Sequence, residues 1–401
     1  MALLGVIGWF HLKLLLDFLN LQRLGESISP LLSSEGGLDN LERTTEYISR
    51  KTRFSVLQDA AELAALICFW SLGGFAWLSH WSSQWGLGSV ASGLLLLGAL
   101  GLSSMILGLP FEWWQTFKVE AEFGLNRTTI GTFITDRVKG LLLTAVIGGG
   151  VGAFVLWVFE NLPYAALWSW AAISAFSLLM AWLSPVLLMP LFMKFTPMAE
   201  SPLRSAILGL AQKLDFPVVD IFLVDGSRRS TKANAFFTGM GRTRRIALFD
   251  TLVEQHAEGE ILAVLAHEIG HAKLGHVPRM IAMSLLTSAV MFGCLQLGLQ
   301  DERLYQAFGC HSGSAALGMV LFMIVWGPWS NLLDLVQNWL SRRHEFEADA
   351  FAKSAMGGGA EMMAALKKLS RAHLSHHSPH PAYVAVHYSH PATVERLAAL
   401  V

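Results

Sequence analysis

The amino-acid sequence predicts a mainly α-helical membrane protein with seven spanning helices and one modest aqueous portion that contains a small β-sheet. Hydrophobic residues make up 53% of the 401 residues and charged residues only 15%, whereas soluble domains carry about 25% charged residues. Long apolar stretches recur along the chain, and one segment of mixed, more polar character interrupts them. Composition and patterning therefore both point to the bilayer.

Seven stretches approach the roughly 20 apolar residues that a helix needs to cross a bilayer. They cover residues 2–20, 60–83, 88–109, 140–159, 166–192, 281–300 and 315–336. The first stretch resembles a signal peptide in position only, because it lacks a basic start and is interrupted by Lys13 and Asp17. We therefore interpret it as a retained span.

The spans divide the chain into four parts. Residues 1–192 hold five spans, residues 193–280 form an aqueous segment, residues 281–336 hold two spans, and residues 337–401 form a C-terminal segment. The aqueous segment alternates between strand-like and helical patterns. Its expected strands are Val218–Val224, Ala233–Thr238 and Ile246–Phe249, and its expected helices are Ala206–Leu214 and Glu258–Gly275.

Basic residues alternate between successive loops. The loops after the first and third spans are basic, and those after the second and fourth spans contain no Lys or Arg. The positive-inside rule then predicts that the N-terminus lies outside, and that residues 193–280 and the C-terminal segment lie in the cytoplasm. The basic residues are Arg23, Arg43, Arg50, Lys51 and Arg53 after the first span, and Lys118, Arg127, Arg137 and Lys139 after the third.

The expected helix Glu258–Gly275 contains an HExxH motif, from His267 to His271. Residues four apart lie on one face of a helix, so both imidazoles can bind one metal ion. Glu268 lies beside them, where its carboxylate can take a proton from a metal-bound water. Zinc lowers the pKa of such a water to about 7. This pattern predicts a zinc site with hydrolytic activity.

A catalytic zinc needs a third protein ligand. His276 is an unfavourable candidate, because nine residues along a continuous helix place it opposite His267. The segment 341–349 offers Glu345, and Asp349 shares its helix face and could accept the outer N–H of a ligand histidine. Glu347 points elsewhere on that helix, whereas residue spacing does not eliminate His344. An ordinary solvated charge run also fits the spacing in this segment.

Other features exclude some classes of protein. The formal net charge of −1 gives no field that would recruit nucleic acid. Cys68, Cys294 and Cys310 lie in or beside apolar stretches without CxxC spacing, which argues against a disulfide framework and a Cys-ligated zinc. A transporter or channel would explain the polar residues within spans, but it would not explain the HExxH motif. A catalytically silent scaffold conflicts with the intact set of ligands and base.

Several segments together resemble the type I CAAX prenyl endopeptidases, which are integral-membrane zinc proteases of the gluzincin group. The resemblance extends over almost the whole chain, and its segments follow one another in the right order. They are KVEAEFGLNRTT from Lys118, PLFMKFTPM from Pro190, VDGSRRSTKANAFFTGMG from Val224, RIALFDTL from Arg245, HEIGHAKLGH from His267, SRRHEFEADAFA from Ser341 and HYSHPATVERLAAL from His387.

The resemblance implies roles for particular residues. It assigns Glu345 as the third zinc ligand and Asp349 as the residue that supports the metal site. It places Asn234 near the substrate and the oxyanion, and it implies that His390 stabilises the tetrahedral intermediate. Donors aimed at a developing oxyanion are often worth several kcal/mol.

The resemblance also implies a large chamber between the seven helices, with the zinc on its cytoplasmic side. Lys13, Asp17 and Glu112 are candidates to face it, because isolated charges facing lipid are costly. The chain departs from the family pattern at two places. Met193 stands where Asn is usual, and Lys232–Ala233 stand where His-Ser is usual. Both changes affect the expected substrate groove and neither removes a ligand or the base.

The C-terminal segment contains a histidine-rich tract from His373 to His390. We interpret it, apart from His390, as a flexible segment broken by prolines rather than as a second metal site.

The resulting hypothesis is a zinc endopeptidase that cleaves peptide or protein substrates at the cytoplasmic side of a membrane. The resemblance implies removal of the C-terminal tripeptide from prenylated CAAX proteins. The chain ends at Val401 without a retrieval tail, which is compatible with a bacterial inner membrane, or with the ER membrane in a eukaryote. The alternative is a membrane-protein quality-control protease that does not depend on prenyl groups.

Overall fold

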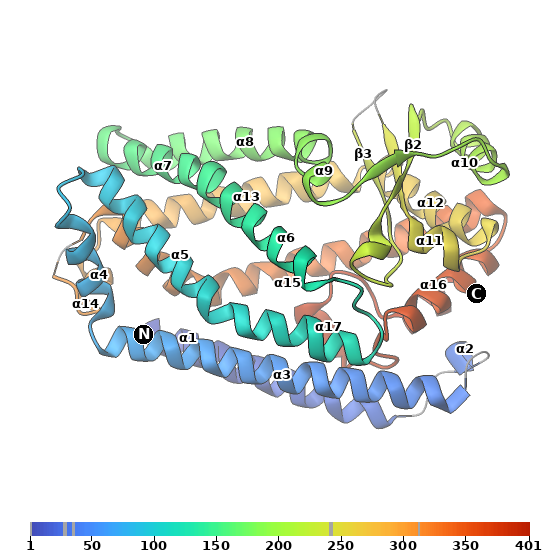
Figure 1. Ribbon diagram of the computed structural model, residues 1–401, viewed down its shortest axis with the longest axis horizontal. Helices are drawn as coiled ribbons and strands as arrows, with labels where there is room; N and C mark the ends of the chain where they lie inside the picture. Colours follow the sequence, from blue (N-terminus) through green and yellow to red (C-terminus); the bar gives the residue numbers. More distant parts are fainter. Residues whose placement is uncertain (1, 27–29, 34–36, 240–243, 312) are drawn as a thin grey trace.

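The computed structural model describes residues 2–26, 30–33, 37–239, 244–311 and 313–401. Within this part of the chain, seven helices are long and apolar enough to cross a membrane, which confirms the predicted number of spans. Most of them run along the longest axis of the molecule, and the strands gather at one end (Figure 1). The predicted class, a helical membrane bundle with a small sheet, is confirmed.

The spans begin and end as follows. They are α1 (Ala2–Gln22), α3 (Gly37–Ser71), α5 (Ser89–Trp114), α6 with α7 (Ile130–Leu143 and Gly149–Asn161), α8 (Ala165–Leu187), α13 (His276–Leu299) and α15 (Ala315–Met356). A π-helical turn, Gln115–Glu120, extends α5, and a second, Thr144–Gly148, joins α6 to α7. Short helices connect the spans: α2 (Pro30–Ser33), α4 (Gly74–Ser83), α9 (Met189–Phe192) and α14 (Glu302–Gln306).

The second span was wrongly placed at residues 60–83. Helix α3 ends at Ser71, and α4 starts anew after Gly73, whose φ of 73° cannot continue a right-handed helix. The spanning part is Leu41–Ser71. Its charged residues concealed it in the sequence, because their partners are distant: Lys51 faces a cavity, Asp59 pairs with Lys13, and Arg50 pairs with Glu122.

The seventh span and the segment with Glu345 form one helix. Helix α15 has 42 residues, starts where the Ser314 hydroxyl accepts the N–H of Leu317, and ends before Gly357. At 1.5 Å per residue it is about 63 Å long, roughly twice the thickness of a bilayer's hydrocarbon core. The division expected at residues 336 and 337 therefore falls within an unbroken helix. The membrane span itself carries Glu345 into the aqueous portion.

The sheet has four strands in the order β1-β2-β4-β3. They are β1 (Phe195–Pro197), β2 (Asp220–Val224), β3 (Ala235–Thr238) and β4 (Arg245–Phe249). The β2–β4 pair is parallel, and the β1–β2 and β3–β4 pairs are antiparallel. The three predicted strands are present. The short β1 was not predicted, because a three-residue strand that includes a proline leaves little pattern. Strand β3 forms an edge of the sheet.

A buried core holds the metal-motif helix against this sheet. Helix α10 (Pro202–Lys213) and helix α12 (Glu258–Lys273) pack on the strands, and α11 (Asp250–Gln255) connects β4 to α12. Helix α12 also packs along α15, where Ala352 is completely buried. The core side chains are Ile207, Ile221, Ile246, Leu248, Ile261 and Leu265. The sheet thus fixes one face of α12, and α15 fixes another.

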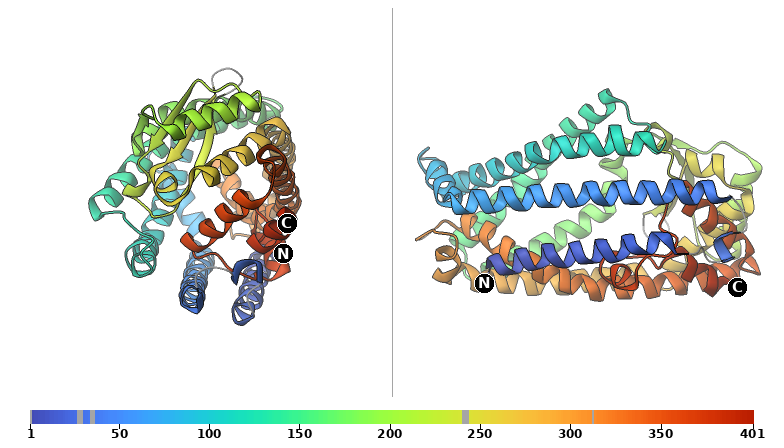
Figure 2. Two further views of the ribbon diagram at one scale, coloured as in Figure 1. Left: turned by 90° about the vertical axis from the view of Figure 1, so that its right-hand side faces the viewer. Right: turned by 90° about the horizontal axis from the view of Figure 1, so that it is seen from below.

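The C-terminal segment is ordered, so the flexible segment expected from its prolines and histidines was wrong. It forms α16 (Ala360–Ala372), α17 (Pro381–His387) and α18 (Thr393–Leu400). His376 is buried, with Nε2 3.0 Å from the carbonyl oxygen of Asn20, and the N–H of His380 donates to Oδ1 of Asn20 at 3.0 Å. Helix α1 lies alongside α15, with α17 beside them (Figure 2).

A cavity of about 1180 Å³ lies between these elements. Its wall includes residues of α1, α3, α12, α15, α16 and the segment before β3. Lys13 and Asp17 line it, as expected. Glu112 was expected there too, but it instead pairs with Arg137, with an N–O distance of 2.7 Å.

Gly359 offers a test of how tightly α18 is held. A Cβ on Gly359 would lie 2.4 Å from the backbone oxygen of Leu400, whereas one on Gly358 would meet nothing within 4 Å. We expect Gly359→Ala to displace α18 and lower the free energy of unfolding by about 1–3 kcal/mol. Gly358→Ala is the matched control. The midpoints of thermal unfolding of the two variants in detergent measure this loss of stability. Equal midpoints would show that α18 can shift to accommodate the added methyl group at no cost in stability.

Candidate active site

Helix α12 presents the two histidines of the motif. Glu258 and Glu260 lie in its first turn, where carboxylates are favourable, and the Glu260 carboxylate accepts the N–H of Ala257 at 3.0 Å. One helical turn separates His267 from His271, and their Nε2 atoms lie 3.1 Å apart. Both ring nitrogens therefore point to the same place.

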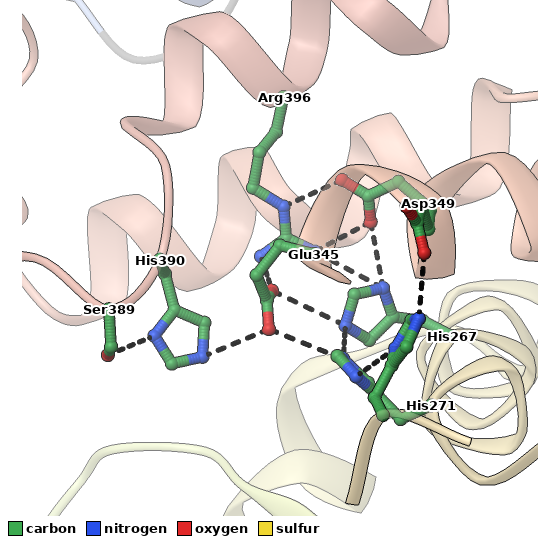
Figure 3. A network of polar contacts seen from close by, with 9 residues as sticks. His267, His271, Glu345, Asp349, Ser389, His390 and Arg396 are labelled. Atoms are coloured by element: carbon green, nitrogen blue, oxygen red, sulfur yellow. Dashed lines mark hydrogen bonds and ion pairs between the residues drawn. The ribbon is translucent and has the colours of Figure 1, made fainter. Parts of the chain in front are cut away.

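Helix α15 brings the carboxylate of Glu345 to these nitrogens. Its Oε2 lies 3.5 Å from Nε2 of His267, and its Oε1 lies 3.3 Å from Nε2 of His271. The three donor atoms lie within 4.8 Å of one another, and no other such group occurs in the residues that the structure describes. Figure 3 shows the three side chains converging from two helices.

The donor set fits a catalytic metal ion. Two imidazoles and one carboxylate are the three protein ligands of many hydrolytic zinc sites, which leave a fourth position open. Glu345 is 4% exposed, and its Oε2 makes no hydrogen bond, although Nη1 of Arg396 lies 3.2 Å away as an ion-pair partner. A metal cation between the three groups would give this buried carboxylate and the two facing imidazole nitrogens a common partner.

Asp349 and Arg396 hold the ligands in place. The Nδ1–H of His267 donates to Oδ1 of Asp349 at 2.8 Å, which leaves Nε2 free to bind metal. Arg396, on α18, donates to the same carboxylate from Nε at 2.8 Å and from Nη2 at 2.6 Å. Its Nη1 also lies 3.2 Å from Oε2 of Glu345. These contacts tie α12, α15 and α18 together.

Sequence reasoning did not single out Arg396. Its only signal is a lone cation in the apolar C-terminal stretch, and a surface role explains such a residue equally well. The structure shows it 9% exposed and paired with two acidic groups.

His276 lies behind His271 and outside the ligand group. Gly275, with a φ of 72°, separates α12 from α13. The prediction that His276 lies opposite His267 assumed one continuous helix, and the break at Gly275 removes that assumption. Nδ1 of His276 lies 3.0 Å from Nδ1 of His271, and its Nε2 lies 3.1 Å from Oε2 of Glu347. His344 stacks on His276, with ring centroids 4.1 Å apart. Neither residue contributes to the convergent donors.

Glu268 lines the cavity next to the two histidines. It is half-buried, and burial raises the pKa of its carboxyl above the usual range, while the imidazoles of His267 and His271 counteract this rise. A raised pKa brings a carboxylate closer to the range in which it can both accept and return a proton.

Asn234 and His390 line the same cavity. Asn234 directly precedes β3, and its Oδ1 accepts the N–H of Ala235 at 2.9 Å. His390 lies beside the ligand group, with Nε2 3.4 Å from Oε1 of Glu345 and Nδ1 2.9 Å from the Ser389 hydroxyl (Figure 3). Of the two departures from the family pattern, Lys232 and Ala233 line the cavity, whereas Met193 lies outside its wall.

Asp349→Asn should weaken metal binding. The substitution removes the charge that holds His267 and Arg396, and such outer contacts are typically worth about 10- to 100-fold in metal affinity. Titration of the metal-free protein with zinc against a chromophoric chelator measures the affinity. Glu395→Gln, on the exposed side of α18, is the matched control. Unchanged affinity in Asp349→Asn would remove Asp349 from the metal centre.

Two known families match this chain in succession. Residues 17–194 match the family described as CAAX prenyl protease N-terminal, five membrane helices, and residues 197–401 match peptidase family M48. The CAAX prenyl protease 1 homolog of rice is 36% identical over 92% of this chain and 89% of its own length. CAAX prenyl protease 1 of Saccharomyces cerevisiae is 33% identical over 98% of this chain and 93% of its own.

The fold matches a crystal structure, that of Ste24p from S. mikatae. The TM-score is 0.94 at 32% sequence identity, and the match covers 100% of this chain and 98% of the other. Family, relatives and fold agree along the whole chain. The chain therefore belongs to the M48 peptidase family with the CAAX prenyl proteases, and it is a multi-pass membrane metalloendopeptidase.

Proposed function

We propose that this chain is a zinc endopeptidase that removes the C-terminal tripeptide of prenylated CAAX proteins at the cytoplasmic side of a membrane. The convergence of His267, His271 and Glu345 on the wall of a large cavity carries this proposal. The chemistry of the donors supports zinc, because imidazole nitrogens with one carboxylate suit it better than they suit Mg²⁺ or Ca²⁺, which prefer oxygen ligands.

The ligands and Glu268 have distinct roles in the proposed reaction. When bound, zinc would polarise the scissile carbonyl and lower the pKa of the attacking water. Glu268 takes the proton from that water and gives it to the leaving amine, so it acts first as base and then as acid. Asp349 and Arg396 keep the Nε2 atom of His267 directed at the site throughout.

Asn234 and His390 are the proposed donors to the oxyanion. The short distance of 3.4 Å from Nε2 of His390 to Oε1 of Glu345, a proposed metal ligand, supports this role. Asn234 lies at the start of β3, from which its amide can reach a substrate held along that edge strand. Hydrogen bonds that strengthen as charge develops on the oxygen lower the barrier to attack.

The proposed substrate class rests on the relatives and on the enclosed site. The relatives from rice and S. cerevisiae are named CAAX prenyl proteases and match nearly the full length of this chain. A cavity of about 1180 Å³ that is lined partly by membrane helices would have room for a lipid-modified C-terminus. The proposed orientation rests on the basic loops after the first and third spans. The membrane would be the inner membrane in a bacterium and the ER membrane in a eukaryote.

Glu268→Gln should abolish turnover while the metal stays bound. The substitution keeps the shape of the side chain and removes the proton acceptor, which is worth about 10²–10⁴-fold in rate. Cleavage of a fluorogenic peptide gives the rate, and metal analysis gives the zinc content. Removal of zinc by a chelator should also abolish cleavage in the wild type. Cleavage by Glu268→Gln at the wild-type rate with one bound zinc would contradict the mechanism.

The prenyl requirement can be tested with matched peptides. A peptide farnesylated at the CAAX cysteine should be cleaved with a higher kcat/KM than the same peptide without the lipid, because apolar burial favours its entry into the membrane site. Glu268→Gln provides the background for both. Equal rates would instead support a quality-control protease without prenyl dependence.

A further inference from the structure

The cavity wall contains a second polar cluster, which includes none of the proposed metal ligands. Residues of α3 and of the segment before β3 line the cavity here, and the π-helical turn Gln115–Glu120 packs against α3 behind them. Lys51 and Lys232 both line the cavity here. The catalytic reaction described above uses neither of them.

Glu120 supplies the one carboxylate that lies near this pair of lysines. Glu120 accepts a hydrogen bond from the hydroxyl of Tyr47 at 2.7 Å, and its Oε2 lies 3.6 Å from Nζ of Lys232. Nζ of Lys51 lies 5.7 Å from the centre of the Tyr47 ring and has no ion-pair partner among the residues that the structure describes. Two ammonium groups thus lie around the single carboxylate of Glu120, Lys232 through its ion pair and Lys51 beside the Tyr47 ring. The cluster therefore keeps an uncompensated positive charge.

The third lysine of the cavity wall differs from this pair. Lys13 forms an ion pair with Asp59. Its charge is thus neutralised within the protein, and it attracts an anion less. The excess positive charge on this part of the cavity wall belongs to Lys51 and Lys232.

Strand β3 relates this cluster to a bound peptide. No strand among the described residues pairs with its outer edge, and Asn234 and Ala235 at its start line the cavity. An extended peptide can add to such an edge, and antiparallel pairing is the commoner and slightly more stable arrangement. A peptide held in that way runs from the end of β3 towards its start, so its C-terminal residues continue past Asn234 towards Lys232.

The length of a tripeptide sets how far its carboxylate extends along this path. Extended residues advance about 3.3 Å each, so three residues beyond the scissile bond end about 10 Å from it. A free α-carboxylate at that point would meet ammonium groups inside a protein-walled cavity, where charges are screened less than on an open surface. Charge-assisted hydrogen bonds are also stronger than neutral ones.

We infer that Lys51 and Lys232 bind the C-terminal carboxylate of the substrate and thereby select peptides that end a short, fixed distance beyond the scissile bond. This inference rests on the proposed peptidase function and adds a specificity site to it. Lys232 acts from the β3 side and Lys51 from α3, so the carboxylate bridges the membrane helix and the sheet.

Matched substrates test the inference in the zinc-loaded, full-length protein. One farnesylated CAAX peptide carries a free C-terminal carboxylate, and the other carries a C-terminal amide. We expect the wild type to prefer the acid by about tenfold in kcat/KM, the size of one lost charge-assisted contact. Lys51→Met with Lys232→Met should bring the ratio of acid to amide close to one. Lys51→Arg with Lys232→Arg should restore most of the preference.

Lys13→Met is the matched control, because it removes a cavity lysine whose charge is already paired. It should keep the preference for the acid. Zinc content and thermal unfolding show whether each variant is folded. A wild type that cleaves both peptides equally, or a double Met variant that keeps the preference, overturns the carboxylate site.

Binding separates this inference from the proposed function. Calorimetric titration of the zinc-loaded wild type with the free tripeptide and with its C-terminal amide needs no turnover. Tighter binding of the acid that is lost in Lys51→Met with Lys232→Met supports the site even if prenylated peptides prove not to be substrates. Equal binding of acid and amide contradicts it, whatever the enzyme cleaves.

Discussion

The hydrogen bond from His267 to Asp349 is the contact on which the rest of the candidate metal site depends. It joins the HExxH helix to the last membrane span, and Arg396 extends it to the C-terminal helix. Both Asp349 and Arg396 are almost fully buried. Isolated buried charges are costly, so this pair is tolerable only because its hydrogen bonds are nearly complete. Loss of any one member removes hydrogen bonds from a buried charged group, and we expect the three helices to respond together.

Much of the molecule could be predicted from sequence because its signals are local. Seven apolar stretches, the HExxH spacing and three alternating strands each depend on neighbouring residues. The assignment of Glu345 as a metal ligand needed more than residue spacing, because an ordinary solvated run of charged residues has the same sequence pattern. Resemblance to a family favoured Glu345, and the structure places its carboxylate beside both histidines.

What could not be predicted depends on contacts between distant segments. The chain turns at Gly275, so His276 lies against His271 rather than on the far side of one helix. Arg396 gains its role from Asp349, 47 residues away. In the C-terminal tract, Asn20 of the first span contacts the ring of His376 and accepts the backbone N–H of His380. The charges of α3 concealed a span because Lys51 lines a cavity and Asp59 pairs with Lys13, and a hydropathy profile contains no information about such contacts.

Because α15 is unbroken between the membrane span and Glu345, a movement of this helix in the bilayer is transmitted to the candidate metal site. Glu345 lies 30 residues beyond the start of the helix at Ala315, about 45 Å along its axis. A change of a few degrees in the tilt of the span, of the kind that membranes of different thickness impose, would move that carboxylate by an ångström or more unless the helix bends. Metal–ligand distances tolerate only a few tenths of an ångström. Either α12 and α18 move together with the span, or the helix bends near Pro328. In both cases the lipid composition of the membrane would affect the reaction rate, because it changes the position of Glu345 relative to the two histidines.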